Sequence, residues 1–105
     1  MKNFMYGALI CIFLAGCGGP GISELNQNIR ESGKAINAGT WSQAEEETRR
    51  FLDNWMYVRS NYHKEDREKL ENLTENLEIS LAVSNKQKAR RDWEKLKHQW
   101  DLMND

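Results

Sequence analysis

Residues 40–62, TWSQAEEETRRFLDNWMYVRSNY, decide the fold of this chain. Apolar side chains in this stretch recur alternately three and four residues apart, as in a heptad repeat, and most other positions are charged or polar. The apolar series is Trp41, Ala44, Phe51, Trp55, Val58 and Tyr62, with Thr48 in step. The stretch therefore predicts an amphipathic helix that follows Thr40 as its N-cap and buries one face.

Similar patterns lie on both sides of this stretch. A first helix is predicted to start at Ser23 as N-cap, with Ile22 as a hydrophobic staple, and to stop at Gly39, a residue suited to the position after a helix. A further helix is predicted to follow Asn85 as its cap. The apolar positions of the flanking helices are Leu25, Ile29 and Ile36 in the first, Leu70, Leu73, Leu77 and Leu81 in the third, and Ala89, Trp93, Leu96, Trp100 and Met103 in the fourth.

The boundary between the second and third helices is left open by the sequence. Residues 59–66 contain neither Gly nor Pro, so the helix could continue through them. Asn61 and the acidic pair Glu65 and Asp66 favour a break at this point. The prediction is thus three to four amphipathic helices.

The composition after residue 20 is typical of an all-α domain. There is no proline, and Gly33 and Gly39 are the only glycines after Gly21, while Glu, Lys, Arg, Leu, Ala and Gln dominate. Residues 23–105 are enough for one small helical bundle and too few for two domains. No cysteine follows Cys17, so packing alone must stabilise the bundle.

The chain also repeats itself at an offset of 45 residues. The matched pairs are Leu25 with Leu70, Ile36 with Leu81, Thr40 with Asn85, Ala44 with Ala89, Phe51 with Leu96, Trp55 with Trp100 and Val58 with Met103. A duplicated helical hairpin is one interpretation, which would resemble a pair of tetratricopeptide units. A closed four-helix bundle is the simpler alternative, because an open array normally needs three repeats to be stable.

The N-terminal segment has a different character from the rest. Lys2 precedes an apolar run from Phe4 to Phe13, followed by Leu14-Ala15-Gly16-Cys17 and then by Gly18-Gly19-Pro20-Gly21. This apolar stretch is too short to cross a bilayer core of about 30 Å. A short apolar run that ends in small residues is the pattern of a removed secretory signal, and an uncleaved anchor is the less favoured alternative.

The cysteine at the end of this segment resembles the lipobox of bacterial lipoproteins. The resemblance implies that residues 1–16 are a signal peptide, that cleavage falls between Gly16 and Cys17, and that the Cys17 thiol carries lipid. Residues 17–22 would then form the lipidated, Gly-rich tether, and the protein would lie outside the cytoplasm, anchored to the cell membrane. Two or three acyl chains make a stable anchor where one chain would not.

The four tryptophans Trp41, Trp55, Trp93 and Trp100 are candidate contacts for a ligand or a partner. All four lie on the heptad stripes, so a place in the core is the favoured interpretation for them. Trp41 and Trp100 stand near helix or chain ends and are expected to be the more exposed pair. Trp55 and Trp93 are the pair that would line a ligand cavity between the helices.

The sequence offers no motif for catalysis, for a cofactor or for nucleic acid. His63 and His98 are expected to be solvated rather than metal ligands, and there is no nucleophile motif or Gly-rich phosphate loop. After removal of Lys2 the chain carries 14 basic and 16 acidic side chains, which does not suggest nucleic-acid binding. We therefore predict a protein that is not an enzyme and needs no metal or cofactor.

Charge is arranged by segment. Residues 64–78 contain six acids against three bases, and residues 86–97 contain six bases against two acids. Pairing between the third and fourth helices is the favoured interpretation, together with Glu45 to Arg49 and Glu46 to Arg50 along the second helix. Contact of the basic stretch with anionic head groups is the alternative.

One further resemblance concerns the mature part of the chain. Gly39, Trp41 and Ala44 open a helix that carries Trp55, and Ser80-Leu81 leads into a second helix with an A-x-x-x-W pattern, Ala89 to Trp93. These residues resemble the uncharacterised domain-of-unknown-function 4363 family of short Firmicutes envelope proteins. The resemblance implies a helical, N-terminally anchored protein, and it implies no catalytic or binding residues.

Together these features predict a lipid-anchored helical protein that presents a surface to another envelope protein. A binding protein for a small apolar or aromatic molecule, or for a wall or lipid fragment, is the alternative. A homodimer formed through the heptad stripes is a third interpretation. Presentation of a surface to an envelope protein is the favoured interpretation.

Overall fold

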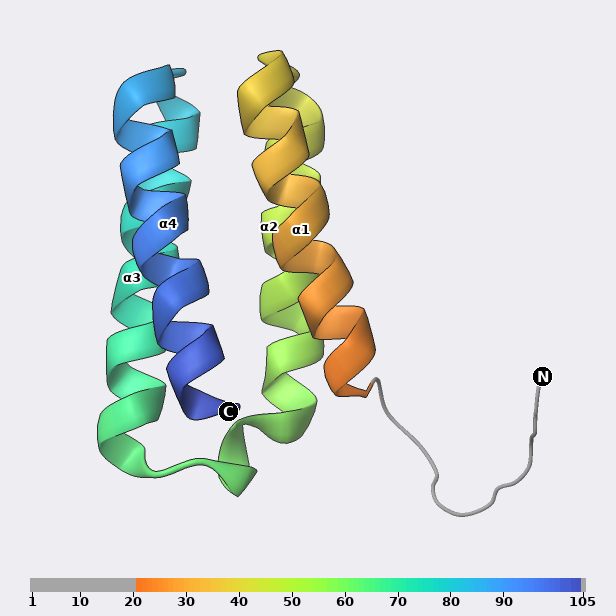
Figure 1. The fold of residues 1–105 in the computed structure, drawn as a ribbon, viewed down its shortest axis with the longest axis vertical. Coiled ribbons are helices and arrows are strands. Elements are labelled where there is room, and N and C mark those ends of the chain that lie inside the picture. Colours follow the sequence, from red (N-terminus) through yellow and green to blue (C-terminus); the bar gives the residue numbers. More distant parts are fainter. Residues whose placement is uncertain (1–20, 105) are drawn as a thin grey trace, which may run out of the picture.

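The computed structural model describes residues 21–104, which form four α-helices and one short 3₁₀ turn. The helices are α1 (Ile22–Ala38), α2 (Trp41–Val58), α3 (Lys64–Ala82) and α4 (Lys86–Met103), and the turn η1 (Arg59–Asn61) follows α2. Figure 1 shows two antiparallel hairpins, α1 with α2 and α3 with α4, side by side and joined at one end by η1. The prediction of a small all-α bundle is confirmed. The proposed signal peptide 1–16, the cleavage site and Cys17 lie outside the described residues.

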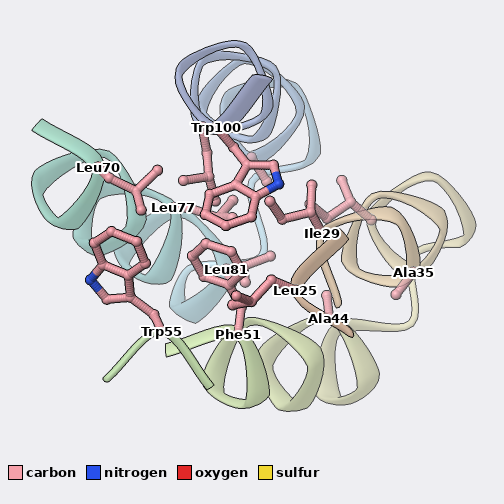
Figure 2. Close-up of a cluster of buried hydrophobic side chains, with 13 residues drawn as sticks. Leu25, Ile29, Ala35, Ala44, Phe51, Trp55, Leu70, Leu77, Leu81 and Trp100 are labelled. Atoms are coloured by element: carbon pink, nitrogen blue, oxygen red, sulfur yellow. The ribbon is translucent and has the colours of Figure 1, made fainter. Parts of the chain in front are cut away.

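The bundle is closed rather than an open array. Helices pack most closely within each hairpin, and the two hairpins meet along two seams, α1 against α4 and α2 against α3. Figure 2 shows Phe51, Leu77, Leu81, Leu25 and Trp100 converging between the helices. Each predicted apolar stripe supplies core residues, because helices of this pitch bring positions three and four apart onto one face.

The repeat predicted from the sequence is present in the structure. An offset of 45 residues places the bounds of α2 on those of α4. Gly39 and Ser84, at equivalent positions, both have a left-handed backbone, with φ of 74° and 54°. Both turns close with the same two backbone bonds, from Gly39 to Ile36 and Thr40 to Ala35 in one hairpin, and from Ser84 to Leu81 and Asn85 to Ser80 in the other. The two hairpins are therefore related by an approximate internal two-fold.

The predicted N-cap of the first helix is wrong by two residues. Gly21 is the N-cap and Ile22 is the first helical residue, so Ile22 does not stand before the cap as a staple and is 39% exposed. Glu24 explains the earlier start. Its carboxylate accepts a hydrogen bond from the Gly21 N–H at 2.8 Å, and this contact fixes Gly21 as the residue that precedes the helix. Asn85 caps α4 as predicted, since its Oδ1 accepts the Lys88 N–H at 3.1 Å. Thr40 is the N-cap of α2 by position, but its hydroxyl donates back to Ala35.

The second and third helices are separate. The backbone becomes extended at Tyr62 and His63, although no Gly or Pro forces it to do so. The Tyr62 ring packs against the rings of Trp55 and Trp100, with centroids 5.3 and 6.1 Å away. Arg67 also donates to the Tyr62 carbonyl at 2.8 Å. Packing of one aromatic side chain thus stabilises a break that helix propensity alone does not require.

The expected ion pairs between α3 and α4 are not found among residues 21–104. The basic residues of α4 pair along their own helix instead, as in Lys88 with Asp92 at 3.1 Å and Lys97 with Asp101 at 2.8 Å. On α2, the predicted pair of Arg50 with Glu46 forms at 2.8 Å, and Arg50 also contacts Glu47.

The polar contact between α3 and α4 is a buried hydrogen bond. The Ser80 hydroxyl donates to the carboxylate of Asp92, which also accepts from Lys88. Burial by itself would raise the pKa of Asp92. Hydrogen bonds from Ser80 and Lys88 and the charges of Lys88 and Lys95 outweigh burial, so the pKa lies below its ordinary value.

This lowered pKa predicts acid sensitivity. A carboxylate whose pKa is lower in the folded state than in the unfolded state stabilises the fold at pH values above its unfolded-state pKa. That contribution is lost as the pH falls below about 4. Replacing Asp92 with Asn is expected to cost about 1–3 kcal/mol near neutral pH and to flatten the dependence of stability on pH in the acid range. Urea unfolding at several pH values measures both effects. Ser80→Ala should change the slope in the same direction, and an unchanged slope in both variants would contradict the assignment.

Candidate functional site

A groove lies along the seam between α1 and α4. Its volume is about 420 Å³. The residues that line this α1–α4 groove are Asn26, Ile29, Arg30, Gly33, Lys34 and Asn37 of α1, with Trp93, Lys97, Trp100 and Asp101 of α4. A volume of this size is within the range of small-molecule and peptide sites.

Trp93 and Gly33 shape the middle of the groove. A Cβ atom at Gly33 would stand 2.5 Å from the Trp93 ring, so the ring fits against α1 only because position 33 has no side chain. The Trp93 indole N–H donates to the Ile29 carbonyl at 2.8 Å and fixes the ring across the seam. The sequence alone assigns no role to Gly33. One signal in the sequence could have marked this position. A glycine inside a predicted helix costs about 1 kcal/mol relative to alanine, which indicates that the position needs the absence of a side chain.

Trp100 is the buried residue at the bottom of the same groove. It is only 1% exposed, so the expectation that Trp100 is one of the more exposed tryptophans is wrong. Its ring packs at right angles to Phe51 and Trp55, and its indole N–H donates to Asn26 on α1. The Trp100 ring is covered because Asn26 of α1 and the Tyr62 ring contact it.

The remaining tryptophans are in or against the core. Trp55 is 1% exposed and donates its indole N–H to Glu71 at 2.7 Å, while Trp41 is partly buried against the core. Trp55 does not line the groove that Trp93 borders, because the rings of Tyr62 and Trp100 pack around Trp55. The structure instead brings Trp93 and Trp100 together. Three of the indole N–H groups thus join one hairpin to the other.

The walls of the α1–α4 groove carry positive charge. Arg30, Lys34 and Lys97 line it against one carboxylate, Asp101, which is paired with Lys97. Lys34 is also 3.5 Å from Glu31, but exposed pairs of this kind contribute little and are easily exchanged for another anion. The groove therefore favours an anionic group.

The seam on the opposite side of the internal two-fold has the opposite charge. This α2–α3 seam contains a smaller hollow of about 240 Å³ lined by Glu45, Arg49, Glu78 and Leu81. Burial, and then the neighbouring charge of Glu75, raise the pKa of Glu78 above its ordinary value. Glu71, in the same face of α3, has a lowered pKa because Arg59 donates to it at 2.9 Å.

The internal two-fold makes these two seams directly comparable. The offset of 45 residues pairs groove residues with positions in the other seam: Arg30 with Glu75, Gly33 with Glu78, Lys34 with Ile79, Trp93 with Thr48, and Lys97 with Leu52. The second set contains no basic or aromatic side chain, although the α2–α3 seam brings its helices together as closely as the α1–α4 seam does. The basic and aromatic character of the α1–α4 groove is therefore not a requirement of the fold.

The two histidines belong to different elements of the fold. His63 is the N-cap residue of α3, and His98 lies on α4 beside Lys69, Leu73, Lys95 and Gln99. Within residues 21–104, no group of three or more His, Cys, Asp or Glu side chains is arranged to hold a metal ion. In the same residues no helix combines the length and the apolar character that a membrane span requires.

Comparison of the chain with models of protein families, with curated proteins and with solved structures finds no match. The resemblances to bacterial lipoproteins and to the domain-of-unknown-function 4363 family therefore stay predictions.

Proposed function

We propose that this chain is a lipid-anchored extracytoplasmic protein, not an enzyme, that binds an acidic segment of another envelope protein in the α1–α4 groove. The anchor is the lipid on Cys17, and the bundle is the binding module. The N-terminal pattern of the sequence and the chemistry of the α1–α4 groove support this proposal.

One observation carries the choice of site. The two hairpins repeat the same helices and turns, yet the groove positions differ from their counterparts in charge and in aromatic content. Side chains that the packing of the helices does not require are available to recognise a partner. Arg30 and Lys34 on one wall face Lys97 and the Trp93 edge on the other, which suits a segment with carboxylates and an apolar side chain.

The chemistry of the lining supports binding rather than catalysis. Cations, amides and indoles surround the groove, and its one carboxylate is paired with Lys97. Such groups hold and orient an anion, whereas general acid–base or nucleophilic catalysis needs a group poised to transfer a proton or to attack.

Photo-crosslinking in intact cells tests the proposal. A benzoylphenylalanine at Lys34 lies on the groove wall, and the same group at Ile79 occupies the equivalent exposed position in the other hairpin. We expect position 34 to capture one envelope protein, and the adduct to fall about tenfold when Arg30 is changed to Glu, because a repulsive charge replaces an attractive one. Mass spectrometry of the adduct should find the captured peptide rich in Asp and Glu.

The control and the anchor are examined in the same cells. Position 79 should give no adduct with that protein, and Cys17→Ser should remove both the N-terminal lipid mass and the membrane fraction. Equal capture from positions 34 and 79 would contradict the choice of groove. A wild-type N-terminus without lipid would contradict the anchor, and an adduct with twice the mass of the chain would indicate a homodimer instead.

A small anionic or aromatic molecule, such as a wall or lipid fragment, is the second candidate for the same groove. The volume of about 420 Å³ and the partly exposed Trp93 edge favour it. This function predicts saturable quenching of tryptophan fluorescence by the fragment, lost in Trp93→Phe, together with no protein adduct at position 34.

A further inference from the structure

Six large apolar side chains are exposed in the described part of the chain, and four of them lie at one end of the bundle. Ile22 is in the first turn of α1, Met56 and Tyr57 are in the last turn of α2, and Leu102 is in the last turn of α4. Their exposed fractions are 39%, 65%, 70% and 57%. The up-and-down order of the helices brings these three helix ends together, as Figure 1 shows at the lower end of the molecule.

The internal two-fold relates two of these side chains. Tyr57 and Leu102 are 45 residues apart and therefore occupy equivalent positions on α2 and α4. The remaining two of the six lie at the opposite end of the bundle. Ile79 is in the last turn of α3, and Val83 directly follows that helix. The molecule thus has one end with four exposed apolar side chains and one end with two.

The end with four is the one that the chain enters. Ile22 is five positions after Cys17, and a chain of that length spans at most about 18 Å. With Cys17 in the lipid, this end of the bundle is held within reach of the bilayer surface, while Ile79 and Val83 point away along a molecule 43 Å long.

We propose that the end formed by Ile22, Met56, Tyr57 and Leu102 docks on the lipid surface beside the anchor. The inference rests on the proposed lipidation of Cys17. Tyrosine is enriched at membrane interfaces because its ring is apolar and its hydroxyl stays in water, and isoleucine, leucine and methionine add apolar area.

Charge does not provide the attraction at this end. The acids Glu24, Asp53 and Glu65 are exposed there and outnumber the exposed base Lys64, and Arg59 is paired with Glu71. An acidic surface gains nothing from anionic head groups. The contact therefore depends on apolar side chains, and we expect it to persist in zwitterionic vesicles and at high salt.

The experiment uses the full, natively lipidated protein purified from membranes and returned to phosphatidylcholine vesicles. Its Cys17 thiol is occupied by lipid and Cys11 leaves with the signal, so one introduced cysteine takes an NBD fluorophore at a single site. Tyr57→Cys reports the anchored end, Leu102→Cys is its two-fold equivalent, and Val83→Cys is the matched control at the far end. Quenching by lipids with a nitroxide near the head group measures contact with the bilayer.

We expect the label at 57 and at 102 to lose about half of its emission, and the label at 83 to lose almost none, with the same values at high salt. Circular dichroism of each labelled protein checks that the bundle is folded. Equal quenching at 57 and 83 in lipidated protein overturns the docking proposal and leaves the anchor intact. An N-terminal mass without lipid overturns the anchor and the docking proposal together.

Discussion

Replacing Trp100 with alanine is expected to lower the free energy of unfolding by about 3–5 kcal/mol. The side chain is 1% exposed and packs against the rings of Phe51, Trp55 and Tyr62, so its removal leaves a large cavity where both hairpins meet. A domain of this size has a total stability of about 4–13 kcal/mol. The variant should therefore lose a large share of its stability, which urea unfolding followed by circular dichroism measures.

Two further variants keep this prediction testable if Trp100→Ala does not fold. Trp41→Ala removes a tryptophan that is only partly buried, and its cost should be less than half as large. Trp100→Phe retains most of the ring volume and removes the hydrogen bond to Asn26, for an expected cost of about 1–2 kcal/mol. A loss for Trp100→Ala no greater than that for Trp41→Ala would show that Trp100 is not a central core residue.

Gly33→Ala is expected to destabilise the protein by about 1–3 kcal/mol, although alanine is the better helix former. Elsewhere in a helix interior the same change stabilises by about 1 kcal/mol. Here the new methyl group would stand 2.5 Å from the Trp93 ring and displace it, together with its hydrogen bond to Ile29.

A double-mutant cycle isolates this contact. In a Trp93→Ala background the obstacle is gone, so Gly33→Ala should now stabilise the protein, and the sign of the effect should reverse. The measurement is urea unfolding of the four proteins of the cycle. The same effect of Gly33→Ala in both backgrounds would rule out the Trp93 ring as the cause.

Much of the fold could be predicted because it follows from local patterns. The spacing of Phe51, Trp55 and their neighbours predicted amphipathic helices, and the offset of 45 predicted the repeated hairpin. Asn85 was a correct cap because an N-cap needs only residues within one turn. The break at Tyr62 could not be decided, since it depends on rings of Trp55 and Trp100 that meet Tyr62 only after the helices assemble.

The candidate site was predicted only in part. Trp93 and Trp100 were among the four candidate residues, but their placement in the α1–α4 groove depends on which helices become neighbours across the bundle. Arg30, Lys34 and Gly33 lie on α1, far in sequence from α4, and nothing local marks them as facing Trp93. The wrong expectation for Trp100 has the same origin, because a residue near the chain end is buried here by α1 and Tyr62.

The turn at residues 59–63 has a consequence for how two copies of the chain can meet. The turn joins two equivalent hairpins. It contains neither Gly nor Pro, so no residue in it prevents a helical backbone, and straightening the turn would merge α2 and α3 into one long helix. In that form each hairpin would pack on the complementary hairpin of another molecule and recover the same seams. Exchange of hairpins between chains would have to disturb the packing of Tyr62 on Trp55 and the contact of Arg59 with Glu71, which lie at this turn.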